Sequence, residues 1–174
     1  SAIWNGEEGG FVRAAGAAQA PLASGVEAIL ERAGEELGRL RAAGAVYDPP
    51  ADPVGRPPIP DPPPPVRGRF SAAAEAALAA TGLWGLAVPE AFGGAGGTML
   101  DLARAITRLA ADVPTAAGIL AVHSAIGGVS AVAAFGSDEQ RARLLPQLAA
   151  GDPLSIFGAT EADAGCDLGR VTSL

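Results

Sequence analysis

Apolar residues recur at helical spacing across residues 21–44. One stripe, at steps of three and four positions, collects Val26, Ile29, Leu30, Ala33, Leu37 and Leu40. This pattern predicts an amphipathic helix, which Pro21 suits at its first turn and Gly44 at its end. Glu35 and Arg39 lie four positions apart on the opposite face, where we expect an ion pair.

Four further helices are predicted in the second part of the chain. Ser71, Thr98 and Ser137 have side chains that suit N-cap positions. Gln140 stands three positions after Ser137 and completes a capping box. The expected ranges are residues 71–80, 98–112, 115–135 and 137–151.

The helices after Thr98 and Ser137 should each present one apolar face to the core. Asp101, Arg104 and Arg108 are expected to face solvent. The expected core positions are Met99, Leu102, Ala103, Ile106, Leu109, Ala110, Leu144, Leu145 and Leu148.

The predicted helix at residues 115–135 is apolar almost all round. Residues 113–137 carry no formal charge and are long enough to span a bilayer. Most of their apolar residues are Ala and Gly, however, and the flanking residues are Asp112 and Asp138 rather than basic anchors. We therefore expect a central buried helix and no membrane span.

Residues 48–67 contain ten of the fifteen prolines in the chain. Proline removes a backbone donor and disfavours helix in the residue before it, so this stretch should be extended. A surface linker is the simpler interpretation, and a ligand for a proline-binding module is the alternative. Residues 1–20 are expected to be a loose lead-in, without the features of a secretory signal.

The pattern changes near the C-terminal end of the sequence. Residues 154–160 are strand-like, and residues 161–167 form a turn of small and acidic residues. A strand that ends at Thr160 and enters such a turn offers a hydroxyl and backbone N–H donors in a small area, which suggests cofactor binding. Glu161, Asp163 and Asp167 are either solvated acids or a cation site.

Composition narrows the possible functions. The net charge of −7 argues against non-specific nucleic-acid binding. A single Cys excludes a disulfide framework or multi-cysteine zinc site within this chain. Leu, Ile, Val and Phe sum to 40 residues, which allows a modest helical core. The glycine-rich run at 93–97 lacks the strand-then-helix context of a dinucleotide fingerprint.

Two single residues could carry chemistry. His123 is the one imidazole in the sequence, and it is either a satisfied core residue or the lining of a ligand cavity. Cys166 lies in a turn between acids and is either an unreactive thiol or a ligand contact.

Three motifs follow one another between residues 82 and 167. The first is Gly82-Leu83-Trp84-Gly85-Leu86-Ala87-Val88-Pro89-Glu90-Ala91-Phe92-Gly93-Gly94. The second joins Phe135-Gly136-Ser137-Asp138-Glu139-Gln140 to Leu145-Pro146 and Gly151. The third is Phe157-Gly158-Ala159-Thr160-Glu161-Ala162-Asp163-Ala164-Gly165-Cys166-Asp167. In this order they resemble the signature motifs of the acyl-CoA dehydrogenases.

The resemblance implies an all-α fold, the helical N-terminal domain of these enzymes, with the first strand of a β-domain at the C-terminal end. The N-terminal helix and the proline-rich stretch look more like those of the longer bacterial members. The expected parts are an extension and helix at 1–47, a Pro-rich linker at 48–69, the helical domain at 70–152 and the start of the β-domain with its flavin-binding turn at 153–174.

The resemblance also implies the activity. Acyl-CoA dehydrogenases hold FAD non-covalently and oxidise an acyl thioester to the trans-2-enoyl thioester. A glutamate base takes the α-proton while the β-hydride goes to flavin N5. That base belongs to the family's C-terminal domain, so we expect no catalytic residue here and no activity from this chain alone. Expected partners are an acyl-CoA or other acyl thioester, an electron-transfer acceptor and further subunits of a homo- or hetero-oligomer, in the cytoplasm.

Site residues are assigned from the resemblance position by position. Cys166 stands where the family has a Ser or Thr that also contacts substrate, so it is a predicted substrate residue too. His123 and Gly127 lie on the helix that lines the family's acyl chamber, and Gly127 with Gly128 would leave room for a bulky acyl group. The predicted flavin contacts are Phe157, Ala159, Thr160, Gly165 and Cys166. No metal site is expected.

Two departures from the family pattern keep alternatives open. Ala162 stands where the family usually has Pro, and Cys166 where it has a hydroxyl. One alternative is a flavin monooxygenase or nitroalkane-oxidase-like relative on the same fold. The other is a non-catalytic or degenerate subunit of that fold.

Overall fold

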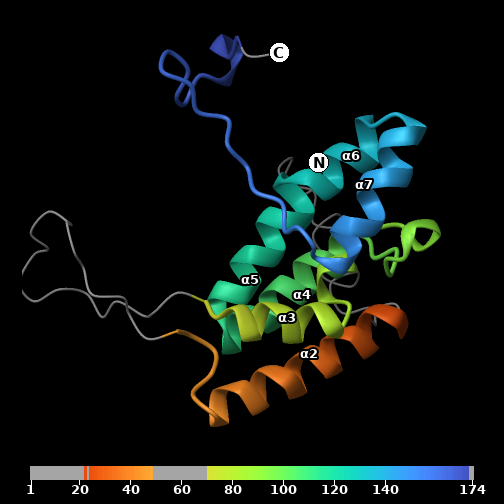
Figure 1. Ribbon diagram of the computed structural model, residues 1–174, viewed down its shortest axis with the longest axis vertical. Coiled ribbons are helices and arrows are strands. Elements are labelled where there is room, and N and C mark those ends of the chain that lie inside the picture. Colours follow the sequence, from red (N-terminus) through yellow and green to blue (C-terminus); the bar gives the residue numbers. More distant parts are fainter. Residues whose placement is uncertain (1–21, 23, 49–69, 173–174) are drawn as a thin grey trace, which may run out of the picture.

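The computed structural model describes residue 22 and residues 24–48 and 70–172 (Figure 1). These residues form six α-helices, a π-helical turn and three short 3₁₀ turns, and no β-strand. The predictions for residues 1–20 and most of the Pro-rich linker lie outside the described residues. The helices are α2 (Ser24–Ala42), α3 (Ala72–Ala80), α4 (Met99–Asp112), α5 (Pro114–Ala121), α6 (Gly128–Phe135) and α7 (Asp138–Ala150). The 3₁₀ turns are η1 (Leu83–Gly85), η2 (Glu90–Phe92) and η4 (Leu168–Arg170), and the π-helical turn is η3 (Val122–Ile126).

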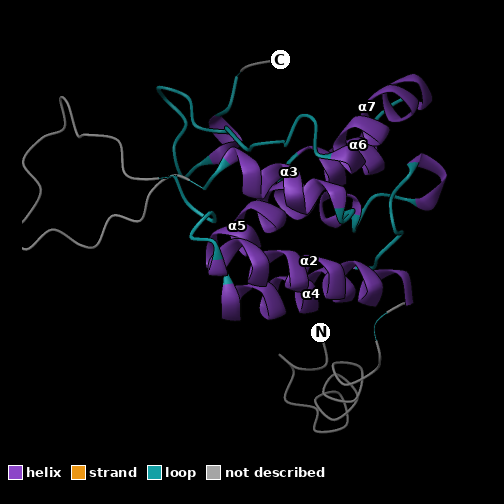
Figure 2. Cartoon of the chain, turned by 60° about the horizontal axis from the view of Figure 1, so that its bottom comes forward, coloured by secondary structure: helices purple, strands orange, loops and turns teal. Residues whose placement is uncertain are grey.

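The amphipathic character predicted for α2 is confirmed, since all six residues of its apolar stripe are buried. α2 lies beside α4 (Figure 2), and Arg108 of α4 donates to Glu27 of α2 at 2.6 Å. The predicted pair of Glu35 and Arg39 is wrong. Arg39 instead binds both carboxylate oxygens of Glu36, because residues three apart also share a helix face.

The chain on either side of the Pro-rich linker meets in the structure. Tyr47 and Phe70 form an antiparallel bridge, and their rings stand edge to face with centroids 6.1 Å apart. The Ser71 hydroxyl donates to the carbonyl of Ala45 at 2.6 Å. α2 therefore shares one core with α3, α4 and α5.

The capping at the start of α4 explains one wrong prediction. The Asp101 carboxylate accepts from the backbone N–H of Thr98 at 2.9 Å and from its hydroxyl at 2.6 Å. Asp101 is therefore buried in a capping box instead of facing solvent. Met99 at the same end is 64% exposed, and Ala103 and Ala110 are exposed too, so the buried face of α4 is narrower than expected.

The predicted helix at 115–135 is interrupted. α5 runs into the π-helical turn η3, where the N–H of Gly127 donates to the carbonyl of Val122 at 2.6 Å. Gly127 then has a non-helical conformation, with φ −86° and ψ −145°, and α6 starts afresh. Phe135 at the end of α6 is 89% exposed. The expectation of one central buried helix is thus wrong for its second half.

One helical stretch within the described residues, Pro114–Phe135, is long and apolar enough to cross a membrane by length and composition. Its most apolar part is 28% buried inside the protein. The buried positions are mostly in α5 and η3, where Ala116, Ala117 and Leu120 join the main core.

α7 follows the sequence closely. Ser137 caps it and Gln140 closes the predicted capping box. Leu145 and Leu148 are buried in a second, smaller apolar cluster with Val88 and Val129. Gly151 ends the helix with φ +75°, a conformation that favours glycine.

Candidate functional site

Residues 153–172 form an arm that leaves the helical body, meaning residues 24–48 and 70–152 (Figure 1). The predicted strand at 154–160 does not form, and the chain is extended there without secondary structure. A β-strand needs a neighbouring strand for its hydrogen bonds, and the described residues supply none beside the arm. Ile156 and Phe157 are consequently exposed.

The predicted turn at 161–167 is present. The N–H groups of Glu161 and Ala164 each donate to the carbonyl of the other residue, at 2.9 and 3.2 Å. The Glu161 carboxylate accepts from the N–H and hydroxyl of Thr172, and the Asp167 carboxylate accepts from the N–H of Gly169. These two acids act within the arm, and no group of three or more His, Cys, Asp or Glu side chains gathers in the described residues.

The five predicted flavin contacts all lie on the arm. Phe157, Thr160, Gly165 and Cys166 are exposed, and Ala159 is half-buried. A Cβ atom at Gly165 would meet no atom within 4 Å in the described part of the chain, its two chain neighbours apart. The structure therefore places these residues on one segment that is largely exposed.

His123 lies in the body, in the turn η3, with 0% of its surface exposed. Its Nδ1 is 3.0 Å from the backbone N of Ser155, and its Nε2 is 3.0 Å from the carbonyl oxygen of Leu148. The ring of Trp84 stands edge to face with it at 6.4 Å. Burial lowers the pKa of His123 below its ordinary value of 6.5, while hydrogen bonds to the carbonyls of Leu148 and Trp84 act in the opposite direction.

Gly127 is next to the same serine. A Cβ atom at Gly127 would lie 2.7 Å from the Ser155 Oγ, and one at Gly128 would lie 3.1 Å from the Ser155 Cβ. Ser155 thus fills the space into which a side chain at either glycine would point. The substrate roles of His123 and Gly127 stay predictions, as does that of Cys166, which is exposed on the arm.

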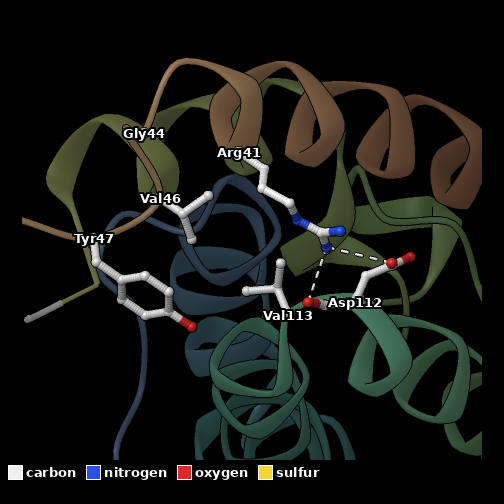
Figure 3. Close-up of a pocket in the computed structure, with 6 residues that line it drawn as sticks. All are labelled: Arg41, Gly44, Val46, Tyr47, Asp112 and Val113. Carbon is white, nitrogen blue, oxygen red and sulfur yellow. Dashed lines mark hydrogen bonds and ion pairs between the residues drawn. The ribbon is translucent and has the colours of Figure 1, made fainter. Parts of the chain in front are cut away.

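A pocket of about 250 Å³ opens elsewhere on the body, where the end of α2 meets the junction of α4 and α5 (Figure 3). Arg41 crosses it and donates to the carbonyl of Asp112 at 2.9 Å and to its carboxylate at 3.3 Å. Tyr47 and Val113 form other parts of its wall. None of the predicted site residues lines this pocket, and its one guanidinium already has a carboxylate partner.

Comparison with known protein families tests the resemblance that the three motifs suggest. The family model of the acyl-CoA dehydrogenase N-terminal domain matches residues 65–152, half of the chain. The chain belongs to the acyl-CoA dehydrogenase family. The part of the helical body that the family model matches, with its capped α4 and α7, is therefore this family's N-terminal helical domain.

Several curated proteins, each named as an enzyme of acyl-CoA compounds, are similar to about half of this chain. An acyl-CoA dehydrogenase of Bacillus subtilis is 38% identical over 90 residues, which is 52% of this chain and 24% of the relative. The acryloyl-CoA reductase (NADH) of Anaerotignum propionicum is 35% identical over 94 residues, 54% of this chain and 23% of the relative. A short-chain specific acyl-CoA dehydrogenase of Clostridium acetobutylicum is 33% identical over 88 residues, 51% and 23% of the two chains. The chain thus spans about a quarter of these relatives' length.

In this acyl-CoA dehydrogenase family member, the arm offers hydrogen-bonding groups of the kind that a flavin needs. Across the described residues, the backbone of residues 156–160 makes no hydrogen bond to another part of the chain. Its N–H and C=O groups, and the Thr160 hydroxyl, are open to a ligand. The Cys166 thiol is a weaker hydrogen-bond donor than the hydroxyl that the resemblance leads us to expect there.

Sequence reasoning missed Ser155. This residue joins the arm to the body, yet it lies 32 positions from its partner His123 and no spacing rule connects the two. The one local signal was a polar residue inside the apolar run at 154–157.

Proposed function

We propose that the full-length protein is a flavin-dependent acyl-CoA dehydrogenase that oxidises an acyl thioester to the trans-2-enoyl thioester. The match of the family model to the helical body carries this proposal. The names of the three relatives support the substrate class, because each designates an enzyme of acyl-CoA compounds. We further propose an oligomeric, cytoplasmic protein that passes electrons to a separate acceptor.

The described residues contribute binding rather than chemistry in this proposal. Bound FAD would supply the acceptor for the hydride from the substrate β-carbon. The backbone of residues 157–160 and the Thr160 hydroxyl would hold the flavin ring by hydrogen bonds. Gly165 and Cys166 would approach the pyrophosphate, because a glycine without neighbours leaves room for close contact.

The test is the visible spectrum of the purified full-length protein. We expect flavin absorbance that bleaches without oxygen when an acyl-CoA is added. A protein that stays colourless after incubation with FAD would support the non-catalytic subunit. Substrate-dependent oxygen consumption with an oxygenated product would instead support the monooxygenase-like relative.

Cys166 tests the assignment of the turn. Restoring the family's hydroxyl with Cys166→Ser should tighten FAD binding by at most about ten- to a hundredfold, because a hydrogen bond to a charged acceptor is stronger than a thiol contact. FAD titration and turnover are measured on both proteins. Unchanged affinity together with unchanged turnover would place Cys166 away from the cofactor.

A further inference from the structure

The chain leaves the helical body at one polar joint, which we define as His123, Leu148 and Ser155. His123 has 0% exposure, and each of its two ring nitrogens lies 3.0 Å from a group of this joint. Leu154, directly before the joint, packs against the main core. After it, residues 156–160 form no hydrogen bond with the body in the described part of the chain.

The partners of the ring fix its proton. The backbone N–H of Ser155 can only donate, so Nδ1 of His123 must carry a lone pair. The carbonyl of Leu148 can only accept, so the proton is on Nε2. His123 is therefore a neutral imidazole that accepts from the arm and donates to the last turn of α7. Burial, which lowers its pKa, agrees with the neutral form.

The Ser155 side chain completes the joint. Its Oγ accepts from the N–H of Gly128 at 2.9 Å and donates to the carbonyl of His123 at 3.2 Å. Gly127 lets the hydroxyl come this close, because a Cβ there would lie 2.7 Å away. The π-helical turn η3 and the break at Gly127 thus provide the space and the hydrogen-bonding groups that hold the Ser155 side chain.

We propose that His123 is a positioning residue, which holds Ser155 through Nδ1 and so fixes where the arm, with its flavin contacts at 157–166, leaves the body. This role rests on the proposed flavin-dependent function. It differs from lining the substrate chamber, since the contact that matters is to the chain itself. A small displacement at the root of a binding segment is costly, because binding groups must meet their ligand within a fraction of an ångström.

Two substitutions test the hydrogen bonds of the two ring nitrogens separately. In His123→Asn the amide oxygen can take the place of Nδ1 and accept from Ser155, while the contact to Leu148 is lost. In His123→Gln the amide nitrogen can take the place of Nε2 and donate to Leu148, while the contact to Ser155 is lost. Both remove the imidazole from the same buried position, so each is the matched control of the other.

The first measurement needs no cofactor. Hydrogen exchange at the Ser155 amide is followed by mass spectrometry in the full-length protein without flavin, with the melting temperature of each variant as a check on folding. We expect exchange about tenfold faster in His123→Gln than in His123→Asn, which corresponds to the loss of one hydrogen bond. Equal exchange in both variants and the unsubstituted protein would overturn the joint.

The second measurement is the FAD dissociation constant of the same proteins. We expect about tenfold weaker binding in His123→Gln and a change within about twofold in His123→Asn. Equal weakening in both variants, in step with melting temperature, would show a merely structural histidine and overturn the positioning role. If the unsubstituted full-length protein binds no flavin, the proposed function fails and the positioning role fails with it, while the exchange result still decides whether the joint exists.

Discussion

Leu120 in α5 and Leu168 in the arm are the same residue type in opposite surroundings, with 0% and 56% of their surfaces exposed. The body around Leu120 is a continuous core that α2, α3, α4 and α5 build together. The arm around Leu168 is held by a few local hydrogen bonds and exposes Ile156 and Phe157 as well. Stability therefore resides in the body, while the residues with predicted flavin contacts lie in the arm.

The two leucines give the largest contrast. Leu120→Ala removes a fully buried side chain and should lower the free energy of unfolding by about 2–5 kcal/mol. Leu168→Ala should change it by no more than about 0.5 kcal/mol. Urea unfolding followed by circular dichroism measures both. A similar loss in the two variants would mean that the arm packs against the body in solution.

Two glycines allow tight and loose packing to be compared within the body itself. Gly151 has φ +75°, and a Cβ there would lie 2.2 Å from Cδ1 of the buried Trp84. Gly93 has φ +86° and open space around it. Gly93→Ala should cost about 1–2 kcal/mol for the backbone alone. Gly151→Ala should cost about 1–3 kcal/mol more, because the methyl group must displace Trp84.

Thermal unfolding of the two alanine variants measures this difference. Gly165→Ala on the arm is the third member of the set, and we expect no effect on unfolding because nothing lies within 4 Å of its Cβ direction. Equal losses for Gly151→Ala and Gly93→Ala would show that Trp84 yields easily and that the end of α7 is loosely packed.

The parts of the fold that local signals determine were predictable. Caps at Ser71, Thr98 and Ser137 act over three residues, and the structure confirms all three. The stripe of α2 was predictable for the same reason, since a helix repeats its own pattern. The break at Gly127 was not, because an apolar run of Ala and Gly is equally compatible with a straight helix.

The candidate site was predictable only in its residue types. The turn at 161–167 follows from its small residues, and the structure confirms it. Whether residues 154–160 form a strand depends on a neighbouring strand, which their own sequence does not encode. The contact of His123 with Ser155 depends on how η3, α7 and the arm come together, so the pattern of any one segment could not reveal it.

The joint between body and arm should respond to pH. His123 is the only histidine among the 174 residues, and its pKa in the folded chain is below the ordinary 6.5. Below about pH 6.5 the unfolded chain takes up a proton that the folded chain does not, so the folded state loses stability as the pH falls toward the lower, folded pKa. Above pH 6.5 both states are neutral at this residue and it contributes no dependence.

Urea unfolding between pH 5 and pH 8 measures this dependence, and His123→Asn is the control that removes the titrating group. The ring contacts Trp84, Leu148 and Ser155, none of which carries a charge. We therefore expect a flatter profile in His123→Asn. An identical slope in both proteins would assign the pH dependence to carboxylates elsewhere.

The smallest expected effect on stability concerns Ser124, a buried serine in η3 that is 2% exposed. Unlike the polar groups of the joint, its hydroxyl has no hydrogen-bond partner among the described residues. The Ser130 hydroxyl, by contrast, donates to the carbonyl of Ala125 at 2.8 Å. Burying an unpaired hydroxyl costs free energy, so Ser124→Ala should leave stability unchanged or raise it by up to about 1 kcal/mol. Ser130→Ala loses a hydrogen bond and should lower stability by about 0.5–1.5 kcal/mol. Both are measured by urea unfolding, and a clear loss in Ser124→Ala would mean that its hydroxyl has a partner in the folded protein.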